Sequence, residues 1–331
     1  MLRLLGVLLG ALVLLGVAGW VGLQTYQAPG PLKDVRAVVV PRASLDQVAD
    51  LLAREGVVKN ATALRVAAVM TRGQGPIKAG ELAFPARSSL RDVLLVLRFA
   101  MVVQHRLLIA EGLTAAQVAL LLDRAVAMDG SVPVPAEGSV LPDTYSYVLG
   151  ANRAAVLERA TKAMDKALEQ AWDARKGDTS PLSGPRDALI LASIVERETS
   201  RPDERARMAA VFLNRLRRGM KLQSDPTVAY GASGGLGVLD HGLTRAELDR
   251  DDPYNTYRIN GLPPGPISMP GLASLKAVTQ PWTTEELFFV ADGNGGHVFA
   301  KTEQEHARNV ARWREMERQR AALRAQVPVA N

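Results

Sequence analysis

The hydrophobic pattern separates one membrane-length apolar segment from a long region of shorter amphipathic elements. Residues 4–23, LLGVLLGALVLLGVAGWVGL, are twenty consecutive uncharged and mainly apolar positions. This is about the length needed to cross a hydrocarbon layer of roughly 30 Å. We expect residues 1–26 to form a cytoplasmic N-terminus and a transmembrane anchor, with Arg3 on the cytoplasmic side. A cleaved signal peptide is the alternative, because the part before the apolar run is short. Both interpretations export the rest of the chain.

A linker at residues 27–35 leads to a segment that predicts a small βααβ module. Two β-branched or apolar strands enclose two helices with polar N-cap residues, at 36–40, 45–54, 61–71 and 81–84. We assign residues 36–100 to this module and expect its end between Phe84 and Val103.

The longer region, residues 101–325, alternates amphipathic helices with short strands and therefore predicts an α+β domain. Its last strands, at 288–291 and 297–300, flank the turn sequence DGNGG and predict a hairpin. A helix dense in Arg and Glu follows, and residues 326–331 are expected to be a frayed tail.

Two carboxylates close the most continuous apolar run of this domain. Residues 188–195 predict a buried helix that ends in Glu196 and Glu198. Two residues correspond to about 200° of helical rotation, so the two side chains cannot share one face. A carboxylate beside an apolar helix loses hydration of its charged form, which raises its pKa and suits a general acid near neutral pH. Periodicity does not choose between them. The structural alternative is that both glutamates form a solvated helix end or pair with Arg197 and Arg201.

The residues after this helix predict a second helix, a polar loop and a glycine-rich segment. The second helix, at 203–218, is amphipathic and should pack beside the first. LQSDPTVAYG at 222–231 predicts a loop, because Asp-Pro is a turn-forming pair and the neighbouring side chains offer hydrogen-bonding groups. The glycine-rich stretch 231–242 predicts a flap over a cleft.

The amino-acid composition excludes several classes of site and partner. The chain has no cysteine, which excludes disulfides and thiolate metal sites, and its four histidines show no metal-ligand spacing, so we expect no metal and no cofactor. The net charge of +6 fits an anionic envelope polymer or a membrane surface. Nucleic acid is not an expected partner, because no nucleic-acid-binding motif is present.

Seven stretches resemble the MltG (YceG-like) family of endolytic murein transglycosylases. They are EGSVLPDTY (137–145), ASIVERET (192–199), VFLNRL (211–216), LQSDPTV (222–228), YNTY (254–257), GLPPGPI (261–267) and FVADGNGGHVF (289–299). They occur in one order over more than a hundred residues, so chance explains them poorly. The segment between Gly138 and Pro142 departs from the family in lacking its usual bulky aromatic residue.

This resemblance implies a fold and a set of site residues. It implies a LysM-like module at 36–100 and a YceG-like lytic transglycosylase domain at 101–325. Glu198-Thr199 is similar to the Glu-Ser pair of lysozyme-like lytic transglycosylases, so Glu198 is the expected general acid and base, with Glu196 in reserve. The expected substrate-binding residues are polar or aromatic members of the matching stretches: Gln223, Ser224, Asp225, Thr227, Tyr254, Asn255 and Thr256.

The resemblance also implies a reaction. Glu198 would protonate the oxygen between N-acetylmuramic acid and N-acetylglucosamine and then take a proton from the muramyl C6 hydroxyl, leaving a 1,6-anhydro end. The partners would be nascent peptidoglycan strands, the inner membrane through residues 4–23, and peptidoglycan synthases, with the catalytic domain outside the cytoplasm limiting strand elongation. A muramidase that consumes water, with Asp225 as its second carboxylate, and a non-enzymatic peptidoglycan-binding scaffold are the alternatives.

Overall fold

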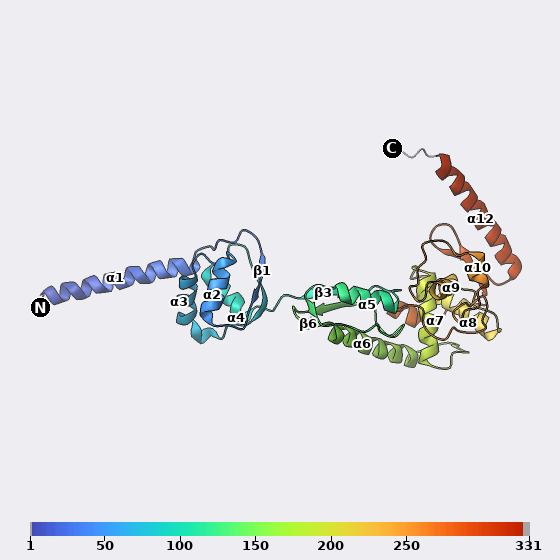
Figure 1. Ribbon diagram of the computed structural model, residues 1–331, viewed down its shortest axis with the longest axis horizontal. Coiled ribbons are helices and arrows are strands. Elements are labelled where there is room, and N and C mark those ends of the chain that lie inside the picture. The colour runs from blue at the N-terminus through green and yellow to red at the C-terminus, as the bar shows by residue number, and fades with distance from the viewer. Residues whose placement is uncertain (1, 327–331) are drawn as a thin grey trace. The chain divides into compact units, whose positions relative to one another are not determined.

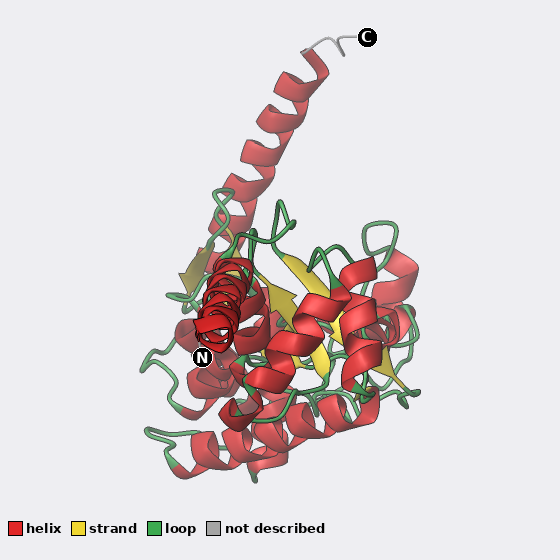
Figure 2. Cartoon of the chain, turned by 90° about the vertical axis from the view of Figure 1, so that its left-hand side faces the viewer, coloured by secondary structure: helices red, strands yellow, loops and turns green. Residues whose placement is uncertain are grey.

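The computed structural model describes residues 2–326, and side chains from 8 to 322. The chain forms two compact units (Figure 1). An N-terminal unit contains the residues up to 105 together with 146–150, and a C-terminal unit contains 106–145 and the residues from 151 onward. Helices predominate in both, and the strands form small two-stranded sheets (Figure 2). The mixed helix and sheet class expected from the sequence is therefore confirmed.

Helix α1 (Leu2–Gln27) contains the apolar segment at the N-terminus. Its stretch Leu8–Gln27 is 20 residues long and apolar enough to cross a membrane, and none of its most apolar window is buried within the structure. The apolar helix of a globular core would be buried by the rest of the chain. The exposed apolar side chains of this helix instead suit an apolar environment that the described residues do not provide. The expected membrane segment thus has a matching helix.

The N-terminal unit continues with the predicted βααβ order. The elements are β1 (Arg36–Val40), α2 (Leu45–Arg54), α3 (Ala61–Met70), a 3₁₀ turn η1 (Arg72–Gln74), β2 (Gly80–Phe84) and α4 (Leu90–Phe99). Strands β1 and β2 pair antiparallel, with Val38 opposite Leu82. The Ser44 hydroxyl caps α2 and the Asn60 side chain caps α3, as expected. Helices α2, α3 and α4 and the strand pair enclose one apolar core.

Residues 105–173, most of which belong to the C-terminal unit, combine short strands with two helices. Its elements are β3 (His105–Leu108), α5 (Ala115–Arg124), β4 (Met128–Asp129), β5 (Thr144–Tyr147), β6 (Ala151–Asn152) and α6 (Arg153–Asp173). β3 pairs with β5, and β4 pairs with β6. Thr114 and Gln117 form a capping box at the start of α5. The two-residue strands β4 and β6 are too short for any hydrophobic pattern to predict them.

The core of this unit is built from helices α7 (Pro185–Glu198), α8 (Arg205–Arg217) and α11 (Leu272–Thr279). The fully buried residues Leu191, Met208 and Leu275, one from each helix, belong to a single apolar cluster. α7 therefore is the buried helix that the apolar run predicts. α11 follows the proline-rich segment and was not predicted from the sequence.

One expectation for this region is wrong: residues 222–231 do not form a loop throughout, because Asp225–Ala232 is helix α9. Pro226 lies in the first turn, where its missing N–H leaves no hydrogen bond unmade and its fixed φ suits a helix. Asp225 also lies in the first turn, where its negative charge is favourable. Asp-Pro thus begins a helix here.

The chain ends as predicted, with a hairpin and a helix. A short helix α10 (Arg245–Asp249), capped by Thr244, precedes them. β7 (Phe288–Ala291) pairs antiparallel with β8 (His297–Ala300), and α12 (Glu303–Gln326) follows. The tail expected at 326–331 lies outside the described residues, apart from Gln326 at the end of α12.

Candidate active site

Glu196 and Glu198 point to different surroundings, as their spacing predicts. Glu198 is the last residue of α7, and its Oε1 accepts a hydrogen bond of 2.5 Å from the Ser224 hydroxyl. The Glu196 carboxylate binds Arg205 Nη2 at 3.0 Å and the backbone N–H of Gly271 at 2.9 Å, and its side chain is only 4% exposed. Glu196 therefore belongs to a buried ion pair that joins α7 to α8 and to the start of α11.

The Ser224 hydroxyl is held in place by a buried network of neighbouring hydroxyls. Ser224 N–H donates to Thr256 Oγ1 at 2.9 Å, and Thr227 Oγ1 donates to the Ser224 carbonyl at 2.7 Å. The two threonine hydroxyls lie 2.8 Å apart. All three side chains are buried. The network fixes the start of α9 so that the Ser224 hydroxyl faces Glu198.

The carboxyl group of Glu198 titrates near neutral pH. Burial raises its pKa from 4.5 to about 7. The hydrogen bond from Ser224 and the charge of Arg215 lower this pKa, whereas the charge of nearby Asp225 raises it further. At neutral pH the group is populated in both protonation states. It can thus give a proton and take one back, which is what a combined general acid and base requires.

Arg215 is a buried cation close to this carboxyl, and sequence reasoning did not single it out. Its Nε donates to the Leu287 carbonyl at 2.6 Å and its Nη1 to the Leu222 carbonyl at 2.9 Å. Burial lowers its pKa, while the charge of Glu198 favours its protonated form. An arginine on the apolar face of an amphipathic helix was the available signal, because such a charge needs internal partners.

Gln223 and Asp225 flank Ser224 in the sequence and are exposed. Gln223 adopts a positive φ of 50° and its N–H donates to the Thr256 carbonyl at 3.1 Å. Asp225 Oδ1 accepts a hydrogen bond of 2.6 Å from the Tyr257 hydroxyl, and burial raises the pKa of Tyr257, so this phenol stays protonated. Tyr257 completes the rim of the site and was missed as a candidate, although the YNTY stretch contains it.

Asn255 and Tyr254, two of the predicted substrate-binding residues, contact other parts of the chain. Asn255 is 1% exposed, and its Nδ2 donates to the carbonyls of Leu248 and Arg250 at 3.0 and 2.8 Å. Tyr254 is half-buried, and its ring lies 4.8 Å from that of Tyr230, centroid to centroid. Asn255 thus satisfies carbonyl groups at the end of α10, and Tyr254 forms part of an aromatic pair.

That aromatic pair contacts a second perturbed carboxyl, Glu137. The Tyr230 hydroxyl donates to Glu137 Oε2 at 3.1 Å, and the Ala115 N–H donates to both carboxylate oxygens. Burial raises the pKa of Glu137, and the hydrogen bonds oppose the rise. Among the described residues, no three His, Asp or Glu side chains lie close enough together to share a metal ion.

These features centre on one carboxyl group, and they are the ones that general acid and base chemistry requires. The chain belongs to the YceG-like family, whose sequence profile it matches over residues 38–312. An endolytic murein transglycosylase of Bacillus subtilis is 37% identical over 173 residues, 52% of this chain and 46% of that protein. One of Streptococcus pneumoniae is 32% identical over 197 residues, 58% of this chain and 34% of that protein.

A solved structure is similar as well. The crystal structure of a YceG-like protein from Listeria monocytogenes has a TM-score of 0.51 at 27% identity, over 83% of this chain and 99% of that one. The matches to the Bacillus and Streptococcus proteins span less than half of the length of those relatives.

Proposed function

We propose that this chain is a membrane-anchored endolytic peptidoglycan lytic transglycosylase. The observation that carries the proposal is the Glu198 carboxyl, which ends a buried helix, accepts a hydrogen bond from Ser224 and has a pKa of about 7. Membership of the YceG-like family and the names of the relatives from Bacillus and Streptococcus supply the substrate class.

In the proposed reaction, protonated Glu198 gives its proton to the oxygen that links N-acetylmuramic acid to N-acetylglucosamine, and the bond from muramyl C1 to that oxygen breaks. The resulting carboxylate takes the proton of the muramyl C6 hydroxyl, whose oxygen bonds to C1. Glu198 is then protonated again, and no water is consumed. One titrating carboxyl is sufficient because the substrate supplies its own nucleophile.

The surroundings of Glu198 divide the candidate residues between two roles. Gln223 and Asp225 are exposed and so are available to contact the glycan, and Asp225 offers a negative charge to an oxocarbenium-like transition state. The other polar candidates are buried and would hold the site in place without contacting the glycan: Ser224, Thr227, Asn255 and Thr256. The ion pair of Glu196 with Arg205 supports a structural role for Glu196, so we propose Glu198 alone as the acid.

The same proposal covers location and organisation. Helix α1 would anchor the chain in the cytoplasmic membrane, with both units on the extracytoplasmic side and a LysM-like module at 36–100. Glycan strands made near the membrane would be the substrate, and peptidoglycan synthases would be the partners. The βααβ order and the apolar helix are the features that support this arrangement.

Product analysis tests the proposal directly. The full-length chain, reconstituted in detergent, is incubated with uncrosslinked glycan strands, and the new ends are identified by mass spectrometry. We expect 1,6-anhydromuramyl ends and, with Glu198→Gln, a loss of at least about 100-fold in rate. Reducing ends, heavier by one water, would instead establish a muramidase and implicate Asp225. Binding without cleavage would support a scaffold.

The Glu196→Gln variant is the matched control for the assignment of the acid. We expect its cleavage rate to fall only in proportion to the fraction of protein that is no longer folded. Cleavage that survives in Glu198→Gln and disappears in folded Glu196→Gln would transfer the role to Glu196.

A further inference from the structure

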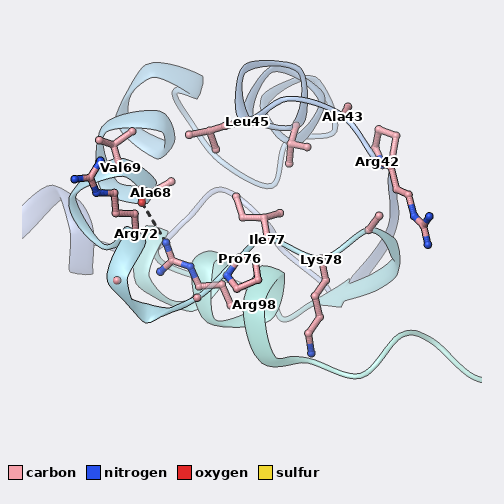
Figure 3. Close-up of a pocket in the computed structure, with 15 residues that line it drawn as sticks. Arg42, Ala43, Leu45, Ala68, Val69, Arg72, Pro76, Ile77, Lys78 and Arg98 are labelled. Carbon is pink, nitrogen blue, oxygen red and sulfur yellow. Dashed lines mark hydrogen bonds between the residues drawn. The ribbon is translucent and has the colours of Figure 1, made fainter.

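A groove in the N-terminal unit is lined by four basic side chains and by no acidic one (Figure 3). It has a volume of about 890 Å³ and is walled by the β1–α2 loop, the end of α3 and the segment between α3 and β2. Arg42, Arg72, Lys78 and Arg98 line it, and no aspartate or glutamate is among its lining residues. Within the described part of the chain, none of these four cations forms an ion pair. Its floor is apolar, with Leu45, Val48 and Ile77 among its lining residues.

Arg98 is the buried member of this group. It is only 3% exposed, yet its guanidinium binds neutral acceptors alone: Thr71 Oγ1 and Gln74 Oε1 at 3.0 Å each, and the Ala68 carbonyl at 3.2 Å. Its Nε is buried without a hydrogen-bond partner. A buried charge without a counterion is costly. An anion in the groove would offset that cost, so the groove fits an anionic ligand.

The same end of α3 borders a second, apolar groove. This groove, of about 590 Å³, is formed by α1 and α3, and none of its lining residues is charged. Ala18, Gly19, Gly22 and Leu23 line it from α1, and Val66 and Met70 line it from α3. Met70 is 80% exposed, and Val66 and Val69 are exposed as well. Large apolar side chains gathered on one exposed face mark an interaction surface.

The two grooves together identify the ligand. The apolar groove is walled by the part of α1 that would lie at the outer boundary of a bilayer, where Trp20 would sit in the interfacial belt. The cationic groove adjoins it across Ala68, Val69 and Arg72. Apolar residues next to unpaired basic residues, at the end of a membrane-length helix, suit acyl chains and anionic headgroups of one leaflet.

We propose that the N-terminal unit is a phospholipid-binding surface: α3 inserts Val66, Val69 and Met70 into the bilayer interface, and the groove at Arg72 and Arg98 takes the phosphate of an anionic headgroup. The inference rests on the proposed membrane anchor and extends it. The unit then lies on the membrane rather than serving only as a spacer or a glycan-binding module.

The absence of cysteine in the chain allows a direct test. A single Met70→Cys substitution carries a fluorescent probe, and the labelled full-length chain is reconstituted into vesicles that contain lipids with nitroxide quenchers. Phosphatidylcholine alone is compared with phosphatidylcholine plus a minor fraction of phosphatidylglycerol. Val39→Cys is the matched control, because Val39 is an exposed residue of β1, which Figure 1 draws away from α1.

We expect strong quenching at position 70, little at position 39, and more quenching at position 70 when phosphatidylglycerol is present. Arg72→Glu should reduce the ratio of docked to undocked units about five-fold or more in the anionic vesicles, the equivalent of about 1 kcal/mol for a basic residue near such a surface. Lys33→Glu, at an exposed lysine of the same unit outside both grooves, should leave the ratio unchanged.

Failure of the inference and failure of the anchor give different results. An unquenched probe at position 70, in a chain that resists alkaline extraction from the vesicles, would overturn the lipid surface and leave the anchor standing. Protection of that unquenched probe by added glycan strands would favour a glycan site. Extraction of the chain by alkali would overturn the anchor itself and, with it, this inference.

Discussion

The Ser224 hydroxyl lies 2.5 Å from Glu198 Oε1, across a contact that joins residues 26 positions apart. This hydrogen bond favours the ionised carboxylate, whereas burial and the charge of Asp225 favour the protonated form. The balance leaves the pKa of Glu198 at about 7. Ser224 and Asp225 thus shift the pKa of Glu198 in opposite directions, and each side chain can be removed by a separate substitution.

Removal of the serine should shift the activity profile to higher pH. In the proposed reaction Glu198 must be protonated to act as an acid, so activity is expected to fall as pH rises through its pKa. Ser224→Ala removes an interaction that lowers this pKa, and the alkaline limb of the kcat/KM profile should move upward. Ser183→Ala, at an exposed serine, is the control. An unmoved limb would show that Ser224 does not set the protonation of the catalytic acid.

Removal of the aspartate should shift the same limb the other way. Asp225→Asn removes a negative charge that raises the pKa of Glu198. The alkaline limb should therefore move to lower pH, with 1,6-anhydro ends still formed at a reduced rate. Complete loss of cleavage at every pH would indicate that Asp225 is a second catalytic carboxylate, as in a muramidase.

The elevated pKa of Glu198 also makes stability depend on pH. A carboxyl whose pKa rises from 4.5 in the unfolded chain to about 7 in the folded protein contributes stability that is fully present below pH 4.5 and is lost as pH rises through 7. The loss at alkaline pH is about 3 kcal/mol. Glu198→Gln should therefore raise the melting temperature at pH 8 and leave it nearly unchanged at pH 4.5.

Glu196→Gln is the counterpart in that experiment. It leaves Arg205, whose side chain is 10% exposed, with only the more distant Glu111 carboxylate at 3.3 Å. Disrupting a buried pair costs about 3–5 kcal/mol, so the melting temperature should fall at both pH values. A gain at pH 8 in Glu196→Gln and not in Glu198→Gln would reverse the assignment of the elevated pKa.

The sequence predicts contacts between residues that are close along the chain better than contacts between residues that are far apart along it. Helix starts marked by a local polar cap were predicted correctly, as with Ser44 at α2. The spacing of the two glutamates predicted that they diverge. It could not choose between them, because the choice depends on Arg205 and Ser224 reaching them in the folded chain. Arg215 was missed for the same reason, since its acceptor at Leu287 lies 72 residues away.

Asn255 illustrates a different limit. A polar residue in a motif predicts a surface contact and a buried structural contact equally well, and here its amide reaches the end of α10. Asn255→Ala should leave those carbonyls unsatisfied at a cost of about 1–3 kcal/mol in unfolding free energy. Asn260→Ala, at an exposed position, is the control. Unchanged stability with a raised KM would instead make Asn255 a glycan contact.

Arg197 should hold the glycine-rich segment 231–242 in place beside the site. Its Nη2 donates to the Gly237 carbonyl at 2.7 Å and its Nη1 to the Gly112 carbonyl at 3.2 Å. Because Arg197 lies between Glu196 and Glu198 in α7, the position of this segment is tied to the helix that carries Glu198. Arg197→Ala removes both hydrogen bonds, and we expect amide exchange in 231–242 to increase about ten-fold or more, as a loss of about 1.4 kcal/mol requires.

The control and the contrary result separate this role from a general loss of stability. Arg258→Ala removes an exposed arginine from the same unit and should leave exchange in 231–242 unchanged. Arg197→Lys keeps the charge but lacks the planar fork that reaches two carbonyls, so its effect should be intermediate. Unaltered exchange in Arg197→Ala would mean that the segment is ordered by other contacts. A uniform rise across α7 and α8 would mean that the substitution destabilises the whole unit.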